Sequence, residues 1–133
     1  MKAVQARISK PIQLKSIITC ADNTGAKMME VIAVRGYHGK LRRLPSAGIG
    51  DVVVCAVVKG KEKNVHQIVY AVVVRQRKEF RRAEGTRVKF EDNAGVVVNS
   101  KTFEPQGTEI RTVIAKEVVA RFSAIGKIAS MVL

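Results

Sequence analysis

The sequence is poor in aromatic residues and in acids. It has no tryptophan, two tyrosines and four phenylalanines, and its 11 aspartates and glutamates stand against 24 lysines and arginines. Proteins that bind single-stranded RNA stack bases on neighbouring aromatic rings, and no two aromatic residues here form such a platform. If the partner is RNA, the sequence therefore favours contacts with the backbone and shape of a folded duplex.

Residues that carry catalytic or metal chemistry are also scarce. The two cysteines, Cys20 and Cys55, each lie in an apolar, β-rich segment, and two cysteines make neither a disulfide scaffold nor a zinc site. The two histidines, His38 and His66, have no obvious orienting acid. We therefore predict reduced core thiols, no catalytic residue, no metal, no cofactor and no enzymatic activity.

Two short motifs resemble catalytic or phosphate-binding signatures but do not meet their requirements. Asp22, Thr24 and Gly25 resemble the triplet of aspartic proteases, yet Asn23 interrupts it and there is no second copy. Gly39-Lys40 lacks the spacing of a phosphate-binding P-loop. Both segments are better interpreted as turns and loops.

Long hydrophobic runs are missing as well. No apolar segment approaches the roughly 18 residues of a membrane-spanning helix, and the N-terminal segment MKAVQARISK has no continuous apolar stretch like that of a signal peptide. We expect a cytoplasmic protein with no membrane partner.

The most prominent feature that is present is positive charge. The net charge of +13 and the isoelectric point near 10.3 favour a polyanionic partner, most commonly nucleic acid. Residues 75–89 hold seven basic residues against two acids, and residues 35–43 hold four against none. An excess this one-sided is not typical of a merely solvated surface. The candidate RNA-binding residues are Lys40, Arg42, Arg43, Lys59, Lys61, Lys63, Arg75, Arg77, Lys78, Arg81, Arg82, Arg87 and Lys89.

Short apolar segments recur every dozen or so residues, with turn signals between them. The main strand candidates are residues 14–20, 27–35, 52–59, 65–74 and 94–98. This rhythm predicts one mostly β domain over residues 1–133, a small antiparallel barrel or sandwich. Residues 87–90 alternate, so that Val88 and Phe90 face one side of a strand and Arg87 and Lys89 the other.

Three further segments complete the predicted chain. Residues 1–13 are interpreted as a basic arm or edge, and the glycine-rich residues 36–50 as a long projecting loop or ribbon. From residue 115 the apolar period becomes helical, with an interruption at Gly126. This stripe is expected to pack on the barrel, and Val118, Phe122 and Ile125 are a weaker candidate surface for a protein partner.

Several of these segments together resemble one known family. Residues 71–74 (AVVV), Gly85, Phe90, Asn93 and residues 96–97 resemble the signature of the universal large-subunit ribosomal protein fourteen family. The similarity extends to residues 21–26 (ADNTGA), 47–51 (AGIGD) and 105–107 (PQG), so it covers most of the chain. Glu84 departs from the family, which more often has Asp, Asn or Ser there, and the N-terminal dozen residues are similar to the archaeal and eukaryotic form.

The resemblance implies a fold and a function. The expected fold is a small closed five-stranded antiparallel β-barrel over about residues 14–114, with a projecting β-ribbon and a short helical part over about residues 115–133. The implied role is that of a structural constituent of the large ribosomal subunit, bound to its RNA and to neighbouring ribosomal proteins. It also implies a place at the subunit interface, a bridge to small-subunit RNA, and a docking surface for an anti-association factor.

Two rival functions remain open at this stage. A free-standing translation factor or regulatory RNA-binding module could use the same basic barrel. An enzyme acting on RNA would need a carboxylate pair or a metal site, which the sequence does not offer.

Overall fold

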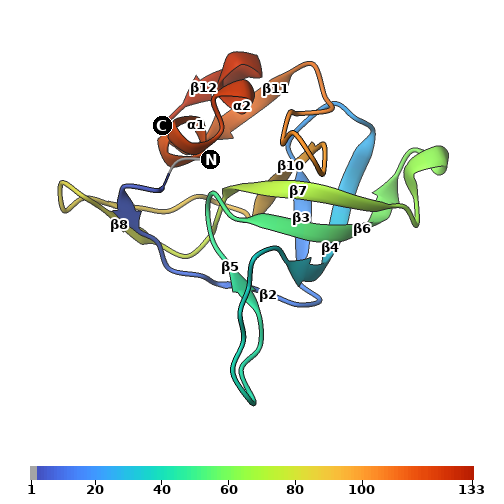
Figure 1. The fold of residues 1–133 in the computed structure, drawn as a ribbon. Coiled ribbons are helices and arrows are strands. Elements are labelled where there is room, and N and C mark those ends of the chain that lie inside the picture. The colour runs from blue at the N-terminus through green and yellow to red at the C-terminus, as the bar shows by residue number, and fades with distance from the viewer. Residues whose placement is uncertain (1–2) are drawn as a thin grey trace.

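A closed β-barrel forms the body of the molecule (Figure 1). The structure is a computed structural model and describes residues 3–133. The barrel strands are β3 (Ile17–Cys20), β4 (Ala26–Val34), β6 (Val52–Gly60), β7 (Ile68–Arg75) and β10 (Ala94–Val98), and they pair around the ring in the order β10-β3-β4-β6-β7. Closure leaves these valine-rich strands without an open edge. The predicted mostly β fold with a five-stranded barrel and short C-terminal helices is confirmed.

One pair of barrel strands is parallel. β10 runs parallel to β3, with Ala94 opposite Thr19, whereas the other four pairs of neighbours are antiparallel. The reason is geometric, because strand directions cannot alternate all the way round a ring of five. The predicted antiparallel arrangement therefore holds for every pair except the one that closes the barrel.

The apolar strands are buried on both faces where the C-terminal part covers them. Residues 71–74 of β7 and all five residues of β10 are buried. They belong to one hydrophobic core with Ile114, Val118 and Ile125 from the C-terminal segment, and the Ala115 amide donates to the Val74 carbonyl at 3.2 Å. Burial on both faces explains why these strands consist almost entirely of apolar residues.

The remaining strands form three small sheets beside the barrel. β1 (Ala6–Arg7), β8 (Phe80–Arg82) and β9 (Arg87–Val88) make one sheet, β2 (Ile12–Gln13) pairs with β5 (Ser46–Ala47), and β11 (Ile110–Ile114) pairs in parallel with β12 (Ala129–Val132). A 3₁₀ turn, η1 (Glu62–Asn64), lies between β6 and β7. The N-terminal segment is thus more than an arm, because both of its strands pair and Ile12 is buried in the core.

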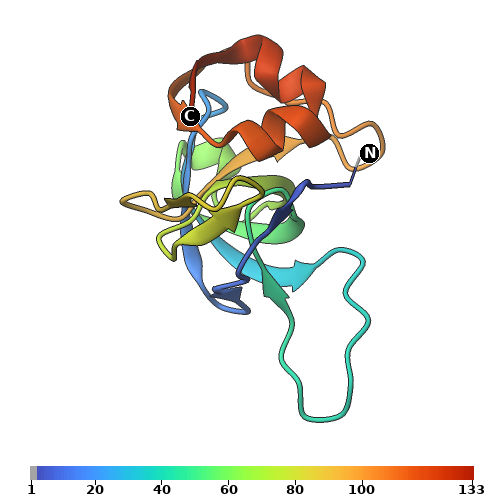
Figure 2. The same ribbon diagram turned by 90° about the vertical axis from the view of Figure 1, so that its left-hand side faces the viewer.

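The segment predicted to be a long projecting loop or ribbon is a projecting loop, and the β-ribbon that the family resemblance implied is not formed within it. Figure 2 shows it extending away from the barrel, on the side opposite the helices. No strand lies between residues 35 and 45, and β5 pairs with β2 rather than across the loop. The Tyr37 hydroxyl donates to the Leu44 carbonyl at 3.2 Å and links the two sides of the loop near its base.

The C-terminal part has two short helices, α1 (Lys116–Arg121) and α2 (Ser123–Ile128). The break between them is at Phe122 (φ −126°, ψ 85°), whereas the sequence predicted it at Gly126. Gly126 lies inside α2, where an added Cβ would come within 2.6 Å of a Val119 methyl group. The glycine therefore allows the two helices to pack closely and does not end a helix.

Candidate nucleic-acid interface

Three arginines stand in a row across the small sheet of β1, β8 and β9. The strand register places Arg7 opposite Arg81, and Arg81 opposite Arg87. All three side chains are exposed, and none has an ion-pair partner within residues 3–133. Directly opposed like charges destabilise a sheet, so this row favours an external anion.

The turn that joins β8 to β9 holds this row in place. Gly85 has a positive φ of 93°, its amide donates to the Arg82 carbonyl at 2.9 Å, and the Arg82 amide donates to the Thr86 carbonyl at 2.8 Å. Glycine adopts this conformation without strain. The predicted alternation is confirmed, because Arg87 and Lys89 are exposed while Val88 and Phe90 are partly covered by the core.

Arg82 faces the opposite side of the same sheet and is not available to RNA. Its guanidinium Nε donates to Glu117 Oε1 at 2.8 Å, and Nη2 donates to the Leu133 carbonyl at 2.6 Å. The side chains of Arg82 and Glu117 are only 10% and 5% exposed. The prediction that Arg82 binds RNA is therefore corrected: this residue joins the hairpin to the C-terminal part.

Arg75 is a second correction. It is buried at the end of β7, where it forms a two-pronged ion pair with Asp92 at 2.8 and 3.0 Å and also donates to the Val113 carbonyl. Burial by itself would raise the pKa of Asp92, but hydrogen bonds from Arg75 and Thr19 outweigh it and hold that pKa below its usual value. Arg75 is therefore a structural residue.

The other eleven predicted basic residues are exposed, and they form three groups. Lys40, Arg42 and Arg43 lie on the projecting loop, Lys59, Lys61 and Lys63 at the β6–β7 turn, and Arg77, Lys78, Arg81, Arg87 and Lys89 on and beside the β8–β9 hairpin. Figure 1 shows the hairpin and the β6–β7 turn on opposite sides of the barrel, with the loop extending in a third direction. The structure therefore does not join them into one continuous patch.

Arg7 is one of the basic residues that sequence reasoning did not include among the candidate RNA-binding residues. It lies 74 positions before Arg81 in the chain, and only the β1–β8 pairing brings the two together. The one signal available in the sequence was the general basic character of residues 1–13.

The candidate surface for a protein partner is also corrected. Val118, Phe122 and Ile125 are 0%, 6% and 0% exposed and belong to the core. The apolar residues that the C-terminal part does expose are Met131, Val132 and Leu133, each about half exposed.

The two cysteine thiols are unreactive near neutral pH. Burial is the main reason that the pKa of each thiol is raised to about 12, so neither is a thiolate near neutral pH. Both are free cysteines, as predicted. Among residues 3–133, no three His, Cys, Asp or Glu side chains cluster as metal ligands would, and no helix is long and apolar enough to cross a membrane.

Fold and surface together define a class, that of small, strongly basic β-barrel proteins whose charged loops surround an apolar core. The family model described as ribosomal protein L14p/L23e matches residues 11–133. The large ribosomal subunit protein uL14 of Halorubrum lacusprofundi is 50% identical over 132 residues, and those of Haloarcula marismortui and Methanoregula boonei are 48% and 45% identical. Each alignment covers 99% of both chains.

The chain belongs to the uL14 ribosomal protein family, in its archaeal form. It is accordingly a structural, non-enzymatic component of the large ribosomal subunit, which is cytoplasmic in archaea. The predicted family, the absence of enzymatic activity and the location are confirmed on this basis, and the rival interpretations as a free-standing factor or an RNA enzyme are set aside.

Proposed function

We propose that this protein holds large-subunit ribosomal RNA through its exposed basic groups and contributes to the interface between the subunits. The observation that carries the proposal is the row of Arg7, Arg81 and Arg87. Like charges directly opposite each other across these strands destabilise the sheet of the free protein. RNA phosphates would relieve this repulsion and accept two-pronged hydrogen bonds from the guanidinium groups.

The spread of the basic groups supports a role as a connector. The hairpin, the projecting loop and the β6–β7 turn point in different directions from one closed barrel, and a single straight RNA helix cannot touch all three. The barrel would fix the distances between separate RNA segments and neighbouring ribosomal proteins. Binding alone performs this role, since the protein needs no chemical step.

The test is the salt dependence of binding to large-subunit ribosomal RNA. If about five to eight phosphates are neutralised, the slope of log K against log salt concentration should be about −4 to −7. Replacing Arg7, Arg81 and Arg87 with Gln should make the slope shallower by about three. Arg111→Gln is the matched control, because Arg111 is 84% exposed and lies outside the three basic groups. A wild-type slope near zero would refute the proposal.

The interface role needs its own experiment. One of the three basic groups should face small-subunit RNA and form the bridge, and the projecting loop with Lys40, Arg42 and Arg43 reaches farthest from the barrel in Figure 2. Three kinds of large subunit, each with all the basic residues of one group replaced by alanine, should be mixed with small subunits and sedimented. We expect one variant to lower subunit association selectively. Normal association for all three would exclude a bridge through these groups.

The surface for an anti-association factor is proposed at a different place from the one the sequence indicated. The exposed residues Met131 and Leu133 would contact it, because Val118, Phe122 and Ile125 are covered. Met131→Asp should then weaken the binding of a purified factor to large subunits, while Ile68→Asp, at an even more exposed apolar residue on the barrel, should leave it unchanged. Equal effects of the two changes would count against this site.

A further inference from the structure

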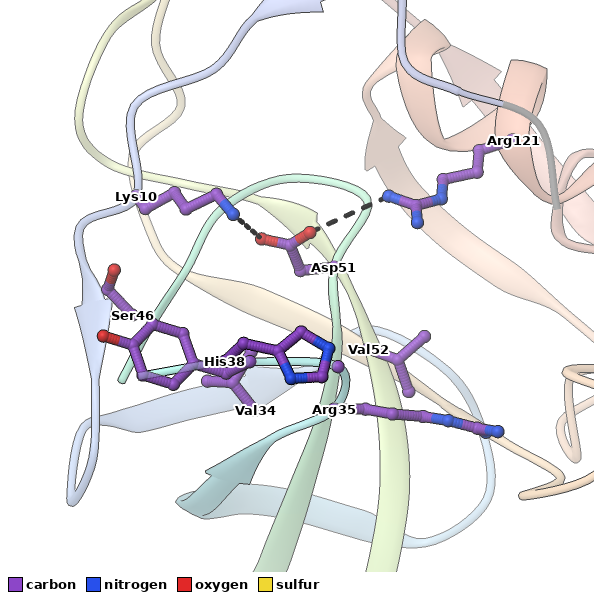
Figure 3. Close-up of a pocket in the computed structure, with 10 residues that line it drawn as sticks. Lys10, Val34, Arg35, His38, Ser46, Asp51, Val52 and Arg121 are labelled. Carbon is purple, nitrogen blue, oxygen red and sulfur yellow. Dashed lines mark ion pairs between the residues drawn. The ribbon is translucent and has the colours of Figure 1, made fainter. Parts of the chain in front are cut away.

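A cleft of about 420 Å³ lies where the base of the projecting loop, the N-terminal segment and α1 approach one another (Figure 3). None of the three basic groups described above contributes a charged side chain to it. The side chains that give it its chemical character are those of Lys10, Arg35, Tyr37, His38, Asp51 and Arg121. Its volume lies within the range of about 300–1,000 Å³ typical of small-molecule sites.

Two cations in the cleft face one carboxylate without close hydrogen bonds. Lys10 Nζ and Arg121 Nη1 are each 3.7 Å from an oxygen of Asp51, as the dashed lines in Figure 3 show. Hydrogen bonds between nitrogen and oxygen are normally about 2.7–3.2 Å long. Asp51 itself accepts a hydrogen bond of 2.9 Å from the Gly48 amide, which fixes the carboxylate between the two cations.

Arg121 has an unsatisfied donor. Its Nε is fully buried and has no hydrogen-bond partner within residues 3–133, and the side chain as a whole is about three-quarters buried. A buried donor without an acceptor is costly, and such donors in native structures usually have a partner that supplies one. The guanidinium fork matches the oxygens of a phosphate group.

The cleft has an excess of positive charge and an aromatic side. Lys10 and Arg121 stand against the single acid Asp51, so an anion is favoured. Arg35 also lines the cleft, but its guanidinium donates to the Ser100 carbonyl at 2.9 Å and lies over the Phe103 ring. The rings of Tyr37 and His38 line the same cleft, and in Figure 3 the His38 ring lies below Asp51. The Tyr37 ring is held by its hydrogen bond to the Leu44 carbonyl, so one ring is already positioned before a ligand enters.

We propose that this cleft binds one unstacked nucleotide of RNA. Its phosphate contacts Arg121 and Lys10, and its base packs against His38 and Tyr37. The inference rests on the proposed RNA-binding function and adds a second mode to it, since the three basic groups contact only backbone and shape. It also gives a role to Tyr37, one of the few aromatic residues, which together with His38 binds one base here and forms no platform for a strand.

The experiment is a titration of the isotope-labelled full-length protein followed by NMR. The probes are the four nucleoside 5′-monophosphates, with inorganic phosphate and adenosine as the separate halves of the ligand. Free nucleotides lack the rest of the RNA, so dissociation constants of about 1 mM are expected and the titration should extend to about 10 mM. We expect the amide signals of residues 35–38 and 51 to shift with a nucleotide, and less with either half.

Three variants separate the cleft from the other contacts. Arg121→Gln should weaken both nucleotide and phosphate binding by about tenfold, since the phosphate loses its forked partner. His38→Ala, a change at an exposed loop residue, should weaken nucleotide binding and leave phosphate binding as it was. Arg111→Gln makes the same chemical change as Arg121→Gln at a residue that does not line the cleft, and should have no effect.

The outcomes distinguish this inference from the proposed function. If no nucleotide shifts the amides of the cleft while ribosomal RNA still binds with a steep salt slope, the cleft inference is wrong and the proposed function stands. If the salt slope is near zero while the cleft binds nucleotides, the proposed function fails and the cleft stands. A shift with inorganic phosphate that equals the shift with every nucleotide would overturn the nucleotide assignment.

Discussion

Arg81 and Arg82 are neighbours in the sequence, but replacing each of them with Ala should have very different effects on stability. The strand directs Arg81 into the exposed arginine row and Arg82 toward Glu117, 35 positions later in the chain. Arg82→Ala would leave a carboxylate that is 5% exposed without its partner. Removing one member of a buried ion pair costs about 3–5 kcal/mol, whereas a surface change such as Arg81→Ala usually costs less than about 0.5 kcal/mol.

The assay is urea and thermal unfolding of the wild type and both single variants, followed by circular dichroism. A loss of 3–5 kcal/mol corresponds to a melting temperature lower by about 10–20 °C for a chain of this size. The double variant Arg82→Met, Glu117→Leu removes both charges and should recover most of the loss, because apolar pairs often replace buried ion pairs at little cost. The effects on RNA affinity should not follow those on stability. Arg81→Ala should weaken RNA binding, and the double variant should leave RNA binding close to wild type.

Equal unfolding midpoints for Arg81→Ala and Arg82→Ala would refute this reasoning. So would a double variant that is no more stable than Arg82→Ala, since the cost would then not come from the unpaired carboxylate. The double variant keeps the test informative even if Arg82→Ala fails to fold.

Three further predictions concern the core, the acid range and the thiols. Val73→Asp should prevent folding, seen as loss of the β-sheet circular dichroism signal, because it places a charge in a fully buried strand. The folded-state pKa of Asp92 lies below its unfolded value. The ionised carboxylate therefore stabilises the folded protein above about pH 4, and this stabilisation is lost as the pH falls further. The difference in unfolding free energy between wild type and Asp92→Asn, measured by urea titration, should shrink in acid. With thiol pKa values near 12, Cys20 and Cys55 should react with Ellman's reagent at pH 8 only after unfolding.

The sequence was most informative where local patterns carry the signal. The apolar segments predicted all five barrel strands to within a few residues, because an apolar run between turn residues depends on nothing far away in the chain. The alternation of residues 87–90 likewise separated core-facing from outward-facing side chains, since strand geometry alone fixes that division. The one-sided charge of the loops predicted exposed cations correctly at eleven positions.

The errors have a common physical cause, which is pairing between distant residues. Arg75 and Arg82 look like their exposed neighbours in the sequence. Their burial is possible because ion pairs with Asp92 and Glu117 offset the cost of desolvating the two guanidinium groups. The apolar stripe of the C-terminal part could be seen in the sequence. Whether Val118 and Ile125 face the barrel or a partner protein depends on what covers them in the folded chain. Their burial shows that the barrel does.

The sequence by itself determined that this protein is basic and mostly β, because apolar periodicity and net charge are properties of short segments and of the whole composition. The periodicity left a barrel or a sandwich open, and the closed barrel was implied by the family resemblance. Tertiary structure decided which cations are free to bind. It placed Arg7 beside Arg81 and Arg87, turned Arg82 inward to Glu117, and brought Lys10 and Arg121 to either side of Asp51. Each of these arrangements joins residues that are tens of positions apart, and only the folded chain brings them within contact distance.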